Sequence, residues 1–152
     1  MKRLLLGSAA LAVAASLTVG LSSGLAATRS AGRATVAVGS TSLGRILVNS
    51  RGRTLYLFEK DKRGKSGCVG KCAAFWPPLL TSGKPLAAAG AKASLLGTTK
   101  RSDGKTQVTY AGHPLYAYVG DSRAGQANGE GSKAFGAEWY VVNAKGKKVD
   151  KD

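Results

Sequence analysis

Short runs of apolar and β-branched residues recur along the chain after residue 33, and the runs are separated by Gly, Asn, Asp and Ser. No stretch in this part sustains the periodicity of a well-capped amphipathic helix, whereas short runs of this kind are typical of strands. The pattern therefore predicts an all-β, mostly antiparallel domain. The predicted strands cover residues 34–38, 45–49, 54–59, 94–99, 106–110, 114–119 and 139–143.

The segments between these runs predict turns and one short helix. Asn49-Ser-Arg-Gly52 joins two apolar runs, and Ser102-Asp-Gly-Lys105 contains the Asp-Gly pair that favours tight hairpins. Residues 72–76 predict one helical turn, which ends before the two prolines because proline cannot continue a helix. The Ala- and Gly-rich residues 82–92 predict a linker, with a brief helix as an option.

The two halves of the predicted domain repeat. Residues 55–61 share a pattern with residues 115–121, at an offset of 60. Further matching positions are Gly52 with Gly112, Val48 with Val108, and Trp76 with Trp139. A repeat of this size cannot easily bury a core alone. We therefore expect repeat one (34–81) and repeat two (93–144) to form one pseudo-symmetric domain over residues 34–144, with the two tryptophans in related core positions.

The N-terminal residues have the pattern of an export signal. Lys2 and Arg3 precede an apolar run over residues 4–19, and the small residues 24–27 provide a cleavage site after Ala26 or Ala27. The alternative is a retained membrane anchor, because the run approaches the length that spans a bilayer. Its Ala- and Gly-rich composition favours cleavage of a signal peptide over residues 1–27. The mature protein is then expected to be exported and soluble, without a transmembrane segment.

Short polar segments flank the predicted domain. Residues 28–33 predict a flexible lead-in. Residues 145–152 alternate in charge and have no apolar residue besides Val149, so they predict a frayed, charged tail.

Composition limits the chemistry that the chain can perform. The 152 residues allow one domain or two very small ones. There are 23 Lys and Arg against 8 Asp and Glu, and the formal charge of +15 falls to +13 without Lys2 and Arg3. His113 is the only histidine, so no cluster of imidazoles can form, and its place before Pro114 favours an exposed or capping role. We expect no catalytic residue, no metal site and no cofactor.

Cys68 and Cys72 are the only cysteines, and exported proteins meet oxidising conditions. One structural disulfide is the favoured interpretation. A redox pair is the second, because Lys65 and Lys71 would lower a nearby thiol pKa, although the thioredoxin-type C-x-x-C spacing is absent. A contribution to a metal site is the third.

Positive charge is concentrated around the cysteines. Such a field attracts polyanions, for example anionic cell-wall polymers, lipid headgroups or extracellular nucleic acid, although nothing in the sequence indicates sequence-specific nucleic-acid recognition. The alternative is a solvated surface that keeps a secreted protein soluble. The candidate anion-contact residues are Lys60, Lys62, Arg63, Lys65 and Lys71.

The repeated segment also carries a motif. In a strand, Tyr56 and Phe58 point to one face, while the leucines before each of them point to the other. Asp61 follows the strand end, where its carboxylate can accept hydrogen bonds from turn amides. The motif is either structural, with aromatic packing and an Asp that fixes the loop, or a surface pocket in which Tyr and Asp bind a ligand or cation. Its presence in both halves favours the structural role.

This motif, Tyr-x-(Phe/Trp/Tyr)-x-x-Asp, carries a resemblance to a known family. Tyr56, Phe58 and Asp61 match it once. The second match is Tyr116, Tyr118 and Asp121. Together with the cysteine pair and both tryptophans, these residues resemble the secreted-repeat family of predicted lipoproteins. The resemblance implies an envelope or extracellular location and no particular activity. Many members are membrane-anchored through an acylated cysteine, which this chain lacks near its cleavage site.

These observations favour an exported, non-catalytic binding or interaction module, located extracellularly or in the periplasm. Its expected partner is an anionic cell-wall polymer, a lipid surface or an envelope protein. The alternative is a redox-linked exported protein that uses Cys68 and Cys72, in thiol exchange or beside a metal or haem partner.

Overall fold

A computed structural model describes residues 32–62 and 64–150, so the predicted signal peptide, residues 28–31, Arg63 and the last two residues lie outside it. Helical segments are short: α1 (Lys71–Phe75), η1 (Ala93–Leu95) and η2 (Ala134–Gly136). The strands are β1 (Thr35–Thr41), β2 (Gly44–Asn49), β3 (Tyr56–Phe58), β4 (Leu86–Ala87), β5 (Leu96–Lys100), β6 (Thr106–Tyr110), β7 (His113–Pro114) and β8 (Trp139–Val141). No helix within the described part of the chain is long and apolar enough to cross a membrane.

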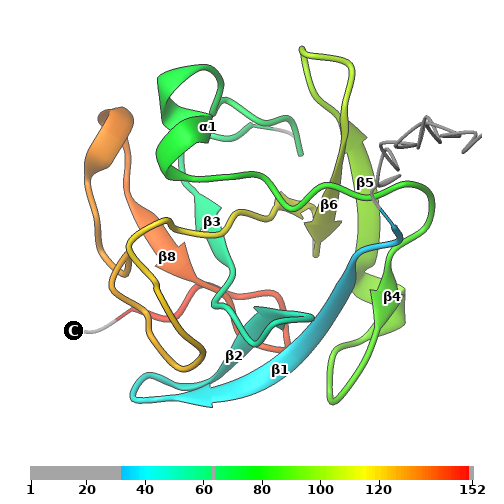
Figure 1. The fold of residues 1–152 in the computed structure, drawn as a ribbon, viewed down its shortest axis with the longest axis vertical. Helices are drawn as coiled ribbons and strands as arrows, with labels where there is room; N and C mark the ends of the chain where they lie inside the picture. Colours follow the sequence, from blue (N-terminus) through cyan, green and yellow to red (C-terminus); the bar gives the residue numbers. More distant parts are fainter. Residues whose placement is uncertain (1–31, 63, 151–152) are drawn as a thin grey trace, which may run out of the picture.

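In the described part of the chain, the strands form three small sheets, ordered β2-β1-β4, β3-β8 and β5-β6-β7 (Figure 1). All pairs are antiparallel except β1 with β4. The expected all-β class is therefore confirmed, and α1 is the helical turn expected before the two prolines. The brief helix considered for residues 82–92 is wrong, because this segment contains the parallel edge strand β4 instead.

The predicted strand over residues 114–119 is only partly regular. β7 ends at Pro114, and Tyr116 then forms isolated bridges to Tyr56 on one side and Pro78 on the other. The peptide groups of Tyr56 and Tyr116 hydrogen-bond to each other in both directions, at 2.8 and 3.0 Å. This reciprocal pair of equivalent residues marks the pseudo-twofold axis that relates the repeats.

The two repeats exchange strands across this axis. β3 of repeat one pairs with β8 of repeat two, which places Phe58 opposite Trp139. In the reverse direction, the Leu79 amide of repeat one donates to the Leu115 carbonyl of repeat two at 2.9 Å. The segment that carries each motif is therefore hydrogen-bonded to the tryptophan segment of the other repeat.

One expected match between the repeats is wrong by a single residue. The carbonyl of Leu47 accepts from the Leu55 amide, as the carbonyl of Val108 accepts from the Leu115 amide. The structural equivalent of Val108 is therefore Leu47, not Val48. The cause is turn length: three residues separate the bonded strand ends in the first repeat and two in the second.

The side chains fill two cores on opposite faces of the motif strands. Leu55 and Leu57 belong to a mainly aliphatic cluster, whereas Tyr56 and Phe58 belong to a mainly aromatic cluster that contains both tryptophans and both cysteines. This confirms the alternation expected from the sequence, and it places Trp76 and Trp139 in related core positions. Burial of these side chains is the main stabilising contribution of the fold.

The expectation of a frayed C-terminal tail is wrong for residues 145–150. Asn143 begins a turn in which its side-chain Oδ1 accepts from the amides of Lys145 and Lys147 at 2.9 and 3.1 Å. The chain then returns along β8, and the Val149 amide donates to the Val141 carbonyl at 2.9 Å. The backbone bonds of this hairpin hold the charged segment in place.

Candidate functional site

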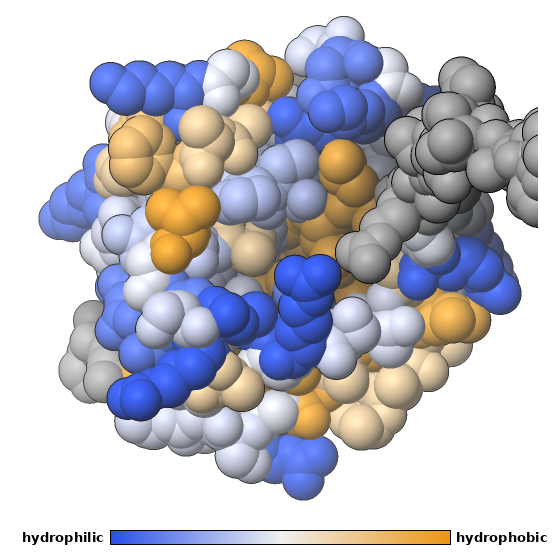
Figure 2. Space-filling view, viewed as in Figure 1, coloured by the Kyte–Doolittle hydropathy of each residue, from blue (hydrophilic) through white to orange (hydrophobic). Residues whose placement is uncertain are grey.

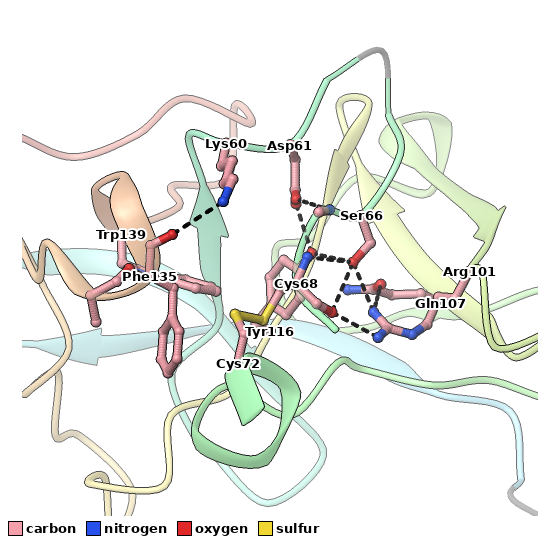
Figure 3. Close-up of a disulfide and its surroundings, with 12 residues drawn as sticks. Lys60, Asp61, Ser66, Cys68, Cys72, Arg101, Gln107, Tyr116, Phe135 and Trp139 are labelled. Carbon is pink, nitrogen blue, oxygen red and sulfur yellow. Dashed lines mark hydrogen bonds between the residues drawn. A yellow bond between two sulfur atoms is a disulfide. The ribbon is translucent and has the colours of Figure 1, made fainter. Parts of the chain in front are cut away.

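The first candidate site is the cysteine loop, defined as residues 60–72, which follows β3 and ends in the first turn of α1. Cys68 and Cys72 form the expected disulfide, with their Cα atoms 5.2 Å apart. Both cysteines are buried, with 0% and 7% of their surface exposed. α1 carries Cys72 inward, and Figure 3 shows the disulfide beside Tyr116, which belongs to the same buried cluster.

A buried arginine of repeat two holds this loop in place through hydrogen bonds (Figure 3). The Nη1 atom of Arg101 donates to Ser66 Oγ and to Gln107 Oε1, both at 2.8 Å, and its Nη2 atom donates to the Cys68 carbonyl at 2.8 Å. Its side chain is 1% exposed and forms an ion pair with Asp103 at 3.3 Å. A planar guanidinium satisfies several acceptors at fixed geometry, which a lysine cannot do. Sequence reasoning missed Arg101, because nothing in its local pattern distinguishes it from a surface cation.

The motif tyrosines and aspartates pair between the repeats. Tyr56 Oη donates to Asp121 Oδ2 at 2.6 Å, and Tyr116 Oη donates to Asp61 Oδ2 at 2.8 Å. Both tyrosines are fully buried, and Asp121 is almost fully buried. The second oxygen of each aspartate accepts from a loop amide, that of Gly67 at 2.6 Å or of Asn128 at 2.8 Å. These bonds use the polar groups of the motif inside the fold, which favours its structural interpretation.

The aromatic residues of the motif complete a stack of four rings. Phe58 stacks on Trp139 at 4.0 Å between ring centroids, Trp139 on Trp76 at 3.9 Å, and Trp76 on Tyr118 at 4.3 Å. Tyr56 and Tyr116 each add an edge contact, to the tryptophan of their own repeat. The order of rings shows that the third motif residue of each repeat covers the tryptophan of the other.

Burial changes the acidity of one motif carboxyl. Removal from water raises the pKa of Asp61 to about 6, although the Gly67 amide, the Tyr116 hydroxyl and the Arg101 charge oppose the shift. Burial also raises the pKa values of Tyr56 and Tyr116, so both hydroxyls stay protonated and donate to their aspartates.

The cations of the cysteine loop face solvent. Lys60, Lys62, Lys65 and Lys71 are exposed, whereas Arg63 lies outside the described residues. The ion pairs found in residues 32–62 and 64–150 involve other cations: Arg101 with Asp103, Lys133 with Glu138 and Lys148 with Glu59. The four loop lysines therefore keep their charge available, with Lys60 Nζ 3.5 Å from the Phe135 carbonyl.

A shallow cleft of about 380 Å³ opens beside this loop, between α1 and η2. The cleft is lined by Lys71, by a small residue at position 132 and another in η2, and by four aromatic side chains: Phe75, Trp76, Tyr118 and Phe135. Tyr118 is the half-buried outer ring of the four-ring stack, so the aromatic core reaches the surface here. Sequence reasoning did not identify this cleft, because Phe75 and Phe135 are far apart in the chain.

The remaining candidate is His113, which is exposed at the start of β7, as expected. Partial burial and the nearby charge of Lys147 lower its pKa. Within the described ranges, no three His, Cys, Asp or Glu side chains come close enough together to hold a metal ion.

Fold and site together define an all-β protein of two interlocked repeats, with one disulfide in the first. Residues 37–80 and 97–143 match the family described as a secreted repeat of unknown function, and the two matches cover more than half of the chain. The chain belongs to this family, which confirms the resemblance carried by its motifs and the expectation of an exported protein. It matches no curated protein and no solved structure.

Proposed function

We propose that this protein is an exported, non-catalytic binding module that contacts anionic surfaces of the cell envelope through its cysteine loop. The proposal rests mainly on the exposed lysines at positions 60, 62, 65 and 71. None of these lysines belongs to an ion pair found within the described ranges. Clustered positive charge attracts polyanions and accelerates their association. The proposed location is extracellular or periplasmic.

The loop is well suited to present these charges because a disulfide and buried hydrogen bonds restrain its backbone. The disulfide closes it, Arg101 binds the Cys68 carbonyl, and Asp61 binds the Gly67 amide. A loop ordered before binding loses less conformational entropy when a ligand binds. The disulfide and the buried arginine thus support a binding surface as well as the fold.

Burial of the disulfide disfavours the redox alternative. Thiol exchange requires a thiolate to reach one sulfur atom of the disulfide. Cys68 is fully buried and Cys72 is 7% exposed. The pair is therefore proposed to be structural.

Binding to inorganic polyphosphate, used as a soluble polyanion, tests the proposal. The variant K60Q/K62Q/K65Q/K71Q is compared with R45Q/R51Q/K84Q/K92Q, which removes the same charge from exposed positions outside the loop. We expect the loop variant to lose about tenfold or more in affinity and much of the salt dependence, since each released counterion adds to the salt slope. Equal losses in the two variants would contradict the proposal, because only net charge would then matter.

A further inference from the structure

Large apolar side chains lie exposed next to the loop lysines. Val69, Phe75 and Val119 are 49%, 45% and 54% exposed, and Phe135 is 36% exposed. The rings of Phe75 and Phe135 lie 6.1 Å apart, and the Val119 amide donates to the Phe75 carbonyl at 3.1 Å. Figure 2 shows apolar side chains on the face over α1 and η2, with hydrophilic side chains beside them. A grouped apolar surface of this kind marks an interaction site more often than scattered residues do.

The backbone at Phe135 is held in a conformation that bulky residues rarely adopt. Its φ is 65° and its ψ is 23°, in the left-handed region that favours glycine. Two bonds hold this segment: Lys60 Nζ lies 3.5 Å from the Phe135 carbonyl, and Trp139 Nε1 donates to the Ala134 carbonyl at 2.9 Å. Strained backbone that the surroundings enforce is concentrated at functional sites. Here it places an aromatic ring at the rim of the cleft.

Charge and apolar surface meet on the same face. Lys71 lines the aromatic cleft, and Lys60 contacts the segment that carries Phe135. A soluble polyanion could use the lysines but offers no apolar phase for these side chains. An anionic bilayer offers both, because lipid phosphates lie directly above the acyl chains.

We propose that this face docks on an anionic lipid bilayer. Val69, Phe75, Val119 and Phe135 enter the boundary between headgroups and acyl chains, while the loop lysines contact lipid phosphates. The inference rests on the proposed function, because the same lysines supply the charge. It adds the identity of the surface, and it gives the apolar side chains a role that electrostatic attraction alone does not.

Vesicle binding by matched variants tests the inference. Vesicles of phosphatidylcholine with phosphatidylglycerol are compared with vesicles of phosphatidylcholine alone. F75Q/F135N removes both rings, and Asn tolerates the left-handed backbone at position 135. The control is L86S, which removes an exposed apolar side chain from β4. We expect F75Q/F135N to bind the anionic vesicles about tenfold more weakly, L86S to bind like the wild type, and both to bind polyphosphate unchanged.

Tryptophan fluorescence reports separately whether the side chain at position 135 enters the bilayer. In F135W, the new indole is expected to shift its emission to shorter wavelength and to be quenched by brominated acyl chains, while the two native tryptophans stay buried in the core. If the wild type binds polyphosphate but F75Q/F135N binds anionic vesicles equally well, or F135W shows no shift, bilayer docking is overturned and the proposed function stands. If the wild type binds neither polyphosphate nor anionic vesicles, both proposals fail.

Discussion

Tyr56 of repeat one donates a hydrogen bond to Asp121 of repeat two at 2.6 Å, and the equivalent Tyr116 of repeat two returns the same bond to Asp61 of repeat one at 2.8 Å. Each motif tyrosine therefore finds its carboxylate acceptor in the other repeat. The strand pairing of β3 with β8 and the stacking of each motif ring on a tryptophan also join one repeat to the other. The motif works as a reciprocal lock between the repeats, whereas the lysines of the cysteine loop face solvent.

Removing one hydroxyl from this lock is expected to destabilise the protein. In Tyr56→Phe, the nearly buried Asp121 carboxylate loses a donor at 2.6 Å, and the Gly129 amide loses its acceptor at 3.2 Å. We expect the free energy of unfolding to fall by about 1–3 kcal/mol, measured by chemical denaturation. Tyr140→Phe is the control, since its hydroxyl bonds Glu138 two residues away, and it should cost less. An equal loss in both variants would contradict the lock.

Asp61 predicts a pH dependence of stability. Its folded-state pKa of about 6 lies above the usual 3.8, so the folded protein binds this proton more tightly than the unfolded chain does. Its contribution therefore favours folding at low pH and is lost as pH rises from about 4 to 6, by about 1–3 kcal/mol. Denaturation across this range should show a pH-dependent difference between the wild type and Asp61→Asn. A constant difference would argue that Asp61 titrates normally.

Arg101 is expected to be essential for the order of the cysteine loop. Arg101→Met leaves the Cys68 carbonyl, Ser66 and Gln107 without their buried donor. We expect a loss of about 3 kcal/mol in unfolding free energy, and faster amide exchange in the loop. Arg51→Met, at an exposed turn position, should change neither quantity. Unchanged exchange in the loop of Arg101→Met would refute this role.

The disulfide is expected to stabilise the fold without taking part in redox chemistry. A cross-link that closes about five residues contributes about 2 kcal/mol in the chain-entropy treatment. The double variant C68S/C72S should lose about this amount and bind polyphosphate about a few-fold more weakly, because its loop is less ordered before binding. In the native protein, thiol titration should find no free thiol after brief exposure to glutathione. Rapid reduction of the folded protein would instead support the redox alternative.

Much of the fold could be predicted because its signals are local. Alternation along residues 55–58 places Leu and aromatic side chains on opposite faces, and the two clusters confirm it. The exchange between repeats could not be predicted, since self-similarity shows that two segments are alike and not which copy each one contacts. β4 could not be predicted because a two-residue parallel strand in an Ala- and Gly-rich segment has almost no sequence pattern of its own.

The C-terminal hairpin had a signal that charge obscured. Asn49-Ser-Arg-Gly52 and Asn143-Ala-Lys-Gly146 have the same pattern, and in both turns the Asn side chain accepts from two following amides. Arg101 had no such signal. Its burial depends on acceptors contributed by the cysteine loop, more than thirty residues earlier.

Amide NMR spectra of the isotope-labelled protein, recorded as polyphosphate is added, test whether the cysteine loop binds polyanions. If the cysteine loop is the contact surface, chemical-shift changes will concentrate in residues 60–72 and will be lost in K60Q/K62Q/K65Q/K71Q. Changes spread evenly over the surface, or centred on the β1–β2 hairpin and β4 at the other end of the molecule (Figure 1), would contradict the claim.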